Sequence, residues 1–284
     1  MDKPSFTVEF GYLTDKGSQR NNNEDSVLVS QKLGLAAVAD GMGGHNAGEL
    51  ASSLAVKTLC ETLASINGGR LSVDKRAPGL SAAANKLRFA MFRANSVIYE
   101  TSRREAKSKG MGTTLSAILI EDGSAALAHV GDSRIYLLRE GALAQLTTDH
   151  SLVMEQLSKG LITKEEAETS TMQNILTRAI GIHRSMEPDA ADVAVRGGDK
   201  LLLCSDGLFK AVKEEDIKRI LSRRRSPGRL CRELVSKAIA NGGPDNVTVA
   251  VAEMKTPGFF SVLLRKFFSA DDAGPAFKAG KPAV

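Results

Sequence analysis

The sequence predicts an α+β fold in which helices pack on the outside of antiparallel sheets. Apolar runs with strand character occur in groups, and so do helical stretches, without the regular strand–helix alternation of a parallel sheet. Of the 284 residues, 42% are hydrophobic and 25% are charged, which suits a globular chain with a sizeable core. No apolar run approaches the roughly 20 residues of a membrane-spanning helix.

The first half is expected to form strands followed by two helices. Residues 7–13 and 26–39 are rich in Val, Leu and Ala, and the polar stretch SQRNNNED separates them. Residues 47–66 and 81–104 then carry apolar side chains at helical spacing. We therefore expect two amphipathic helices packed on a sheet.

The second half begins with four apolar runs between residues 113 and 146, each broken by a turn signal, which predicts an antiparallel meander. A polar helical excursion is expected next, and then a strand, two helices and a last strand, at residues 151–180, 201–204, 213–222, 228–240 and 247–252. We expect one domain over residues 1–256, with a flap at about 151–178.

Charge and cysteine usage limit the classes of partner and the compartment. The formal net charge is +5, but aromatic residues make up only 5% and Trp is absent, so nucleic-acid binding is not expected. Cys60, Cys204 and Cys231 form no metal-binding or disulfide pattern and are expected to be reduced. The polar N-terminus has no apolar core of a secretory signal, so we expect a cytoplasmic protein.

Aspartates fall at the ends of strand-like runs, each near glycine: Asp40, Asp132, Asp206 and Asp245. An Asp beside Gly is also ordinary turn chemistry. Because strand ends at one edge of a sheet lie close together, we expect these four acids to converge. Two carboxylates 4 Å apart repel by roughly 4 kcal/mol at an effective dielectric of about 20, so such a cluster requires cations or protonation. An all-oxygen site favours Mg²⁺ or Mn²⁺.

Two further segments add candidate functional groups. In DGMGGH, the glycines allow close backbone approach, the Gly41 carbonyl is a candidate ligand, and His45 can reach a leaving group. In RNNNED, Arg20 offers a planar fork for phosphate oxygens, while Glu24 and Asp25 are further acids that can hold metal-bound water. Taken singly, these residues also fit an incidental turn and a solvated charged loop.

These segments together resemble the metal-dependent protein phosphatase family (PPM, the type 2C serine/threonine phosphatases) in its compact bacterial form. The resemblance covers about residues 7–254, and its matching pieces run in family order: TDKGSQRNNNED, DGMGGH, AGE, GMGTTL, HVGDSR, TTDHS, LLLCSDGL and GGPDNVTV. It implies a four-layer α-β-β-α sandwich of two antiparallel sheets flanked by paired helices, with a binuclear metal centre at one end.

The resemblance also implies roles for individual residues. Asp40 would bridge two Mg²⁺ or Mn²⁺ ions, and Asp132 with Asp206 would hold a third, weaker ion. The remaining expected ligands are the Gly41 carbonyl and, through water, Glu24 on one ion, and Asp206 and Asp245 on the other.

The implied reaction is direct hydrolysis of phosphoserine or phosphothreonine by a hydroxide shared between the ions. Arg20 would clamp the phosphate, and His45 would protonate the leaving group. A thiol nucleophile is not expected, because Cys204 and Cys231 each have Lys, not Arg, six positions on. Many bacterial members have His-Pro before the NILTRAIG-like run, whereas residues 170–173 here are STMQ, so the flap contacts and substrate preference stay open.

We therefore expect a protein phosphatase that acts on phosphorylated proteins and counteracts a bacterial serine/threonine kinase, as a monomer. A phosphoprotein-binding pseudophosphatase and a metal-dependent nuclease are the alternatives. Outside the motifs, residues 259–268 (FFSVLLRKFF) have an amphipathic helical pattern that predicts docking on the domain, with partner or membrane-surface contact as alternatives. Residues 269–284 are rich in Ala, Gly and Pro and are expected to be disordered.

Overall fold

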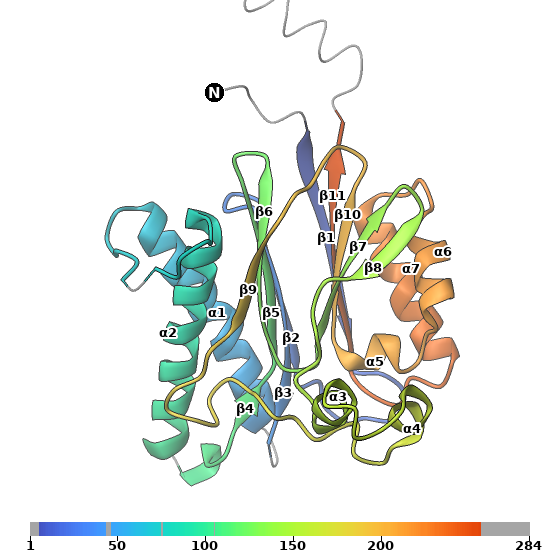
Figure 1. Ribbon diagram of the computed structural model, residues 1–284, viewed down its shortest axis with the longest axis horizontal. Helices are drawn as coiled ribbons and strands as arrows, with labels where there is room; N and C mark the ends of the chain where they lie inside the picture. Colours follow the sequence, from blue (N-terminus) through green and yellow to red (C-terminus); the bar gives the residue numbers. More distant parts are fainter. Residues whose placement is uncertain (1–5, 44–46, 75, 105, 257–284) are drawn as a thin grey trace, which may run out of the picture.

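The computed structural model describes residues 6–43, 47–74, 76–104 and 106–256. Two antiparallel sheets face each other, and helices cover the outer face of each sheet (Figure 1). This is the four-layer α-β-β-α sandwich that the family resemblance implies, so the predicted fold class is confirmed.

The first sheet has five strands in the spatial order β1-β11-β10-β7-β8: β1 (Thr7–Asp15), β11 (Val247–Lys255), β10 (Lys200–Cys204), β7 (Arg134–Arg139) and β8 (Ala142–Gln145). The second sheet follows the order β2-β3-β5-β6-β9: β2 (Asp25–Ser30), β3 (Leu35–Met42), β5 (Leu115–Glu121), β6 (Ser124–Val130) and β9 (Asp189–Val193). The short β4 (Gly112–Thr113) pairs with the end of β3.

Each sheet has its own pair of covering helices. The helices α1 (Ala47–Asn67) and α2 (Ala82–Arg104) lie on the second sheet, while α6 (Glu214–Leu221) and α7 (Pro227–Ala240) lie on the first (Figure 1). The short helices are α3 (Leu152–Ser158), α4 (Lys164–Thr169), α5 (Asp206–Phe209) and a 3₁₀ turn at Ala106–Ser108. The helices α3, α4 and α5 lie at the same end of the sandwich (Figure 1).

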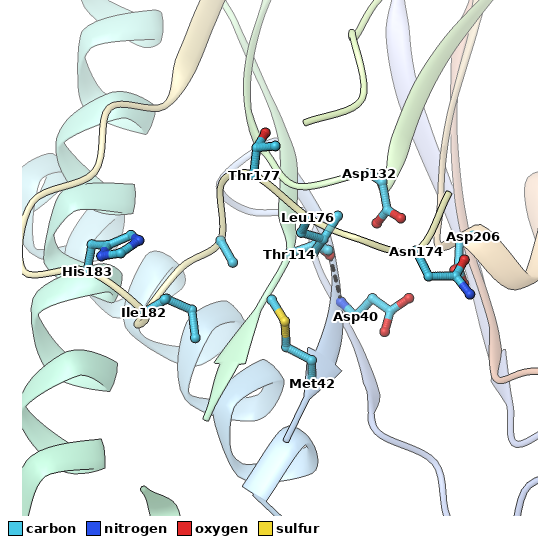
Figure 2. Close-up of a pocket in the computed structure, with 11 residues that line it drawn as sticks. Asp40, Met42, Thr114, Asp132, Asn174, Leu176, Thr177, Ile182, His183 and Asp206 are labelled. Atoms are coloured by element: carbon cyan, nitrogen blue, oxygen red, sulfur yellow. Dashed lines mark hydrogen bonds between the residues drawn. The ribbon is translucent and has the colours of Figure 1, made fainter. Parts of the chain in front are cut away.

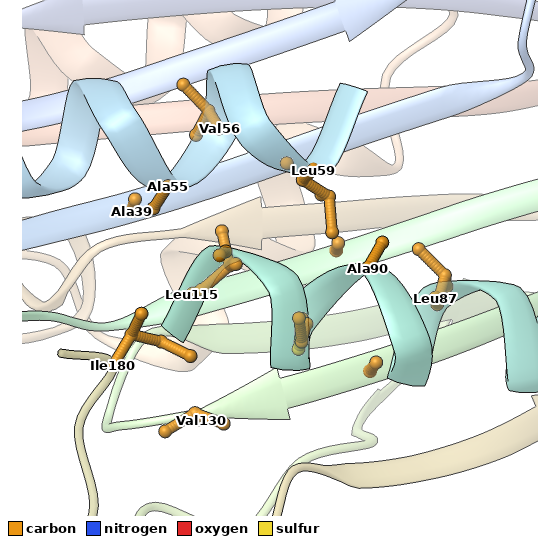
Figure 3. Packing of buried hydrophobic residues seen from close by; sticks show 14 of the residues in the cluster. Ala39, Ala55, Val56, Leu59, Leu87, Ala90, Leu115, Val130 and Ile180 are labelled. Atoms are coloured by element: carbon orange, nitrogen blue, oxygen red, sulfur yellow. The ribbon is translucent and has the colours of Figure 1, made fainter. Parts of the chain in front are cut away.

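The core has three apolar layers, because the central strands are buried on both faces. In β3, Leu35, Ala37 and Ala39 pack against α1 and α2, whereas Ala36 and Val38 lie between the sheets. Small alanines on both helices allow close approach to the sheet, as Figure 3 shows for Ala55 and Ala90. This packing fixes the strand ends from which the site is built.

Two sequence predictions are corrected. Residues 26–39 do not form one run; a turn at residues 31–34 divides them into the antiparallel pair β2 and β3. Residues 113–146 are not a continuous meander, because β5–β6 and β7–β8 are hairpins in different sheets and the Gly131–Ser133 turn crosses between them. Turn chemistry alone does not distinguish a hairpin from a crossing.

The other expected strands and paired helices are present within a few residues of their predicted ends, whereas the helical excursion expected at residues 151–180 contains two short helices that end at Thr169. The strand β9 and the helix α5 were not predicted. The strand β9 reads DAADV, whose polar and small side chains give no strand signal. No helix in the described ranges is long and apolar enough to cross a bilayer. The predictions for residues 259–268 and 269–284 fall outside the described residues.

Candidate metal centre

A pocket of about 340 Å³ opens at the end of the sandwich where the two sheets and the flap meet. Three of the predicted acids line it (Figure 2). Asp40 lies near the C-terminal end of β3, Asp132 in the turn that crosses between the sheets, and Asp206 at the start of α5. The acids thus come from both sheets, not from one edge of a single sheet as expected. Facing sheets bring them together because each strand ends at the same side of the sandwich.

The fourth predicted acid, Asp245, lies close by, next to Arg20. The Arg20 guanidinium donates a 2.7 Å hydrogen bond to Oδ2 of Asp245, and the backbone N–H of Asn246 donates to Oδ1 at 2.8 Å. Asp245 is near enough to contribute to the raised pKa of Asp40. The structure therefore places Arg20 beside the site acids, with its guanidinium hydrogen-bonded to the Asp245 carboxylate.

Asn246 anchors the polar loop that carries Arg20 and Glu24. Its side chain accepts a hydrogen bond from the Glu24 backbone N–H at 2.8 Å and donates to the carbonyls of Lys16 and Asn22, both at 2.9 Å. One buried amide thus joins the first loop of the chain to the last strand. Asn246 stands beside Asp245 in GGPDN, but no local pattern indicates its role in joining these segments.

Asp25 is a site acid to which the sequence analysis gave only a secondary role. It is buried directly opposite Asp40 in the β2–β3 register. Its Oδ2 accepts a 2.7 Å hydrogen bond from the hydroxyl of Ser205, which precedes Asp206 and accepts from the Thr248 backbone N–H. Asp25 therefore ties the second sheet to the first.

The GMGTTL segment holds the backbone of Asp40. The Asp40 N–H donates to the Thr114 hydroxyl at 2.9 Å (Figure 2). The Thr114 N–H donates to the Asp40 carbonyl at 2.8 Å, and the Thr113 hydroxyl donates to that carbonyl. The Thr114 hydroxyl also shares a hydrogen bond with Ser133, beside Asp132. The two threonines thus fix two acid-bearing segments relative to each other.

Close contact between backbone segments requires glycine at position 41 of the DGMGGH segment. A Cβ on Gly41 would lie 2.1 Å from the Gly48 carbonyl oxygen and 2.6 Å from that of Glu24. A Cβ on Gly48 would in turn lie 2.3 Å from Oε2 of Glu24. The start of α1 can therefore rest directly on the acid-bearing strand. His45, the predicted general acid, lies outside the described residues.

Burial and mutual repulsion raise the pKa values of the clustered acids. Burial, opposed by the Ser205 hydroxyl, raises the pKa of Asp25 to about 7, and burial together with Asp206 raises that of Asp132 to about 7. For Asp40, burial and then Asp25 and Asp206 raise the pKa well above its usual value. At neutral pH these carboxyl groups therefore either bind protons or require a nearby cation to neutralise their charge.

The donor set fits a hard divalent cation. Oδ1 of Asp25 and Oδ1 of Asp206 are buried without a hydrogen-bond partner among the described residues. All the candidate donors are oxygens, which suits Mg²⁺ or Mn²⁺. Within the described ranges no three acid, His or Cys side chains close into a compact metal-binding cluster. The carboxylates instead surround the pocket, a spread that their repulsion favours.

An ion pair supports the loop behind Asp206. The Arg134 guanidinium binds both carboxylate oxygens of Asp149 and lies 3.7 Å from the ring centroid of Phe209. Burial raises the pKa of the Cys204 thiol to about 12, which disfavours its thiolate form.

The flap closes one side of the pocket. Its ends are fixed by isolated bridges between Ser151 and Leu176 and between Thr113 and Ile180. Asn174 and Thr177 line the pocket, with Asn174 beside Asp206 (Figure 2). The STMQ segment (residues 170–173), which lacks the His-Pro pair noted in the sequence comparison with the family, directly precedes Asn174.

Comparison with known proteins identifies the family. A family model described as protein phosphatase 2C matches residues 16–237. A serine/threonine protein phosphatase, PstP, of Mycobacterium tuberculosis is 39% identical over 254 residues, which are 89% of this chain and 46% of that protein. The chain thus spans about half the length of this relative. A serine/threonine phosphatase, stp, of Listeria monocytogenes is 38% identical over 249 residues, 85% of this chain and 94% of that protein.

Solved structures agree with the sequence matches. The catalytic domain of PstP, in complex with two manganese ions, superposes with a TM-score of 0.75 at 38% identity, covering 87% of this chain and 98% of that one. The sandwich, the site acids in both sheets and these similarities lead to one conclusion. The chain belongs to the protein phosphatase 2C family.

Proposed function

We propose that this protein is a Mg²⁺- or Mn²⁺-dependent serine/threonine protein phosphatase. The observation that carries the proposal is the convergence of Asp40, Asp132 and Asp206 from both sheets on one pocket, where the buried Oδ1 of Asp206 has no partner in the described structure. The names of the relatives and the two manganese ions in the PstP structure support the same function.

The proposed ligands are Asp40, the Gly41 carbonyl, Asp206 and Asp245, with Glu24 acting through water. When bound, the ions supply an activated water that attacks phosphorus directly and stabilise the charge on the phosphoryl oxygens. Oδ1 of Asp206 is free to accept such an ion, whereas Asp245 has both oxygens engaged by Arg20 and Asn246.

The remaining roles belong to cationic and acidic side chains. Arg20 binds the substrate phosphate, for which its guanidinium must turn from Asp245 or serve both groups; its side chain is 55% exposed and free to do so. His45 donates a proton to the serine or threonine leaving group. Asp25 holds Ser205, and so the start of α5, in place through its 2.7 Å hydrogen bond.

Hydrolysis of p-nitrophenyl phosphate and of a phosphothreonine peptide tests the proposal. We expect turnover with Mn²⁺, its loss on chelation, and its return when Mn²⁺ is added back. Losing a residue that only orients a metal ligand costs about 10–100-fold, so Asp206→Asn should cost at least about a hundredfold. Asp122→Asn, in the exposed β5–β6 turn, is the matched control.

Turnover that survives both chelation and Asp206→Asn would refute the metal mechanism. Phosphopeptide binding without hydrolysis in Mn²⁺ would instead identify a pseudophosphatase.

We further propose that the physiological substrates are proteins phosphorylated by a bacterial serine/threonine kinase, and that the protein acts in the cytoplasm as a monomer. Phosphoproteomics of a deletion strain would identify those substrates.

A further inference from the structure

The side chain of Lys210 lies against the acids of the candidate metal centre. It is the C-cap of the four-residue helix α5, four positions after Asp206. Its ammonium contacts Oδ2 of Asp206 at 2.5 Å and Oδ1 of the flap residue Asn174 at 2.5 Å. The Lys210 side chain is 30% exposed and that of Asp206 13%, so this contact is partly shielded from solvent.

The two oxygens of Asp206 have different surroundings. Oδ1 is buried and has no hydrogen-bond partner among the described residues, whereas Oδ2 is engaged by the Lys210 ammonium. One oxygen is thus available to a metal ion, and the other is already neutralised by a cation of the chain.

Asp132 lies at the same pocket as the two residues that Lys210 contacts. Asp206 and Asn174, which accept hydrogen bonds from the Lys210 ammonium, line this pocket together with Asp132. Asp132 and Asp206 are the pair that the family resemblance associates with a third, weaker ion.

A surface Lys–Asp pair at this spacing is usually of little consequence, because water screens it. The Lys210 pair differs in three respects: its Asp206 partner is largely buried, the ammonium has a second acceptor on the flap, and a second carboxylate, Asp132, lines the same pocket. A cation attached to the chain does not dissociate, so a weakly bound free ion must displace it to reach Oδ2 of Asp206.

We propose that the ammonium of Lys210 takes the place of a third metal ion between Asp132 and Asp206, so that this phosphatase binds two divalent ions. The inference rests on the proposed metal centre. It gives Lys210 the role of a built-in cation at the pocket, and it leaves Oδ1 of Asp206 for one of the two ions.

Manganese stoichiometry tests this role independently of activity. Equilibrium titration of the full chain with Mn²⁺ and native mass spectrometry should give two ions for the wild-type protein. Lys210→Met should bind a third ion at least about tenfold more tightly than the wild type does. Anomalous diffraction from manganese-soaked Lys210→Met crystals should locate that ion beside Asp132 and Asp206. Lys210→Gln repeats the test with a polar neutral side chain.

Two further variants complete the design. Lys210→Met/Asp132→Asn should return to two ions, because the new site loses an anionic ligand. Lys213→Met removes an exposed lysine three residues away and should also keep two ions.

Three ions on the wild-type protein, with the third lost in Asp132→Asn, would overturn the role of Lys210 while leaving the metal centre intact. Two ions on both Lys210 variants would overturn it as well. Absence of ion binding in every form would instead refute the metal centre, and the inference with it.

Discussion

Asp132→Asn should stabilise the metal-free protein at alkaline pH, although it removes a residue of the candidate metal centre. Burial and Asp206 raise the pKa of Asp132 from 3.8 to about 7. Without a metal ion, and even with Lys210 nearby, the folded protein must therefore either protonate this group or tolerate its charge. Asn has the same shape as the protonated acid and carries no charge.

The size of the effect follows from the two pKa values. Because the folded pKa is higher than the unfolded one, Asp132 costs almost nothing below about pH 4, and its cost grows as the pH rises through about 7. A difference of about 3 pKa units at 1.36 kcal/mol per unit gives about 4 kcal/mol. Asp132→Asn should thus match the wild type near pH 4 and exceed it by up to about 4 kcal/mol at pH 8.

Urea unfolding followed by circular dichroism, after exhaustive chelation and at several pH values between 4 and 8, measures this difference. Comparing two proteins at each pH cancels contributions that both share, such as that of buried His129, whose pKa burial lowers to about 3. Asp122→Asn in the exposed turn is the control for the same chemical change outside the site. A gap between Asp132→Asn and wild type that stays constant or shrinks toward pH 8 would refute the argument from crowded, buried carboxylates.

Three other substitutions test how the site is held. Gly207→Ala should destabilise the protein by roughly 2–3 kcal/mol in urea unfolding, because the new Cβ would lie 2.0 Å from the Asn246 carbonyl oxygen; unchanged stability would contradict that close approach. Asn246→Ala should cost about 2–3 kcal/mol and most of the turnover, since it leaves three backbone groups of the first loop without their partner; rescue by Gln would argue against this geometry. Arg134→Lys should cost about 1–3 kcal/mol, because an ammonium replaces neither the two-pronged contact with Asp149 nor the stacking on Phe209, and a wild-type unfolding midpoint would refute it.

The sequence was most informative where periodicity and motif coincide. Helices α1 and α2 follow from apolar spacing, and the structure places them within one residue of the predicted limits. Asp40, Asp132 and Asp206 were chosen because each follows an apolar run beside glycine, and the structure brings all three to one pocket. Local patterns sufficed because strand ends in a sandwich are concentrated at its two ends.

Contacts between residues far apart in the sequence could not be predicted from local patterns. The Gly131–Ser133 turn has the composition of a hairpin, yet the chain crosses there to the opposite sheet. The contacts of Asn246 with the loop near residue 22 join positions more than 220 residues apart, and no local pattern reports them. Lys210 carries a weak local signal, its i,i+4 spacing from Asp206, but the second contact with Asn174 depends on how the flap folds.

The position of β11 has a consequence for synthesis of the protein. In the described structure the first strand, β1, pairs only with β11, which is the last strand of the sheet to leave the ribosome and lies between β1 and β10. A nascent chain therefore leaves β1 unpaired and lacks the support for Asp245 until residues 247–255 have been synthesised. The first sheet can form only after that point, and a product truncated before β11 leaves a strand edge unpaired, which promotes aggregation.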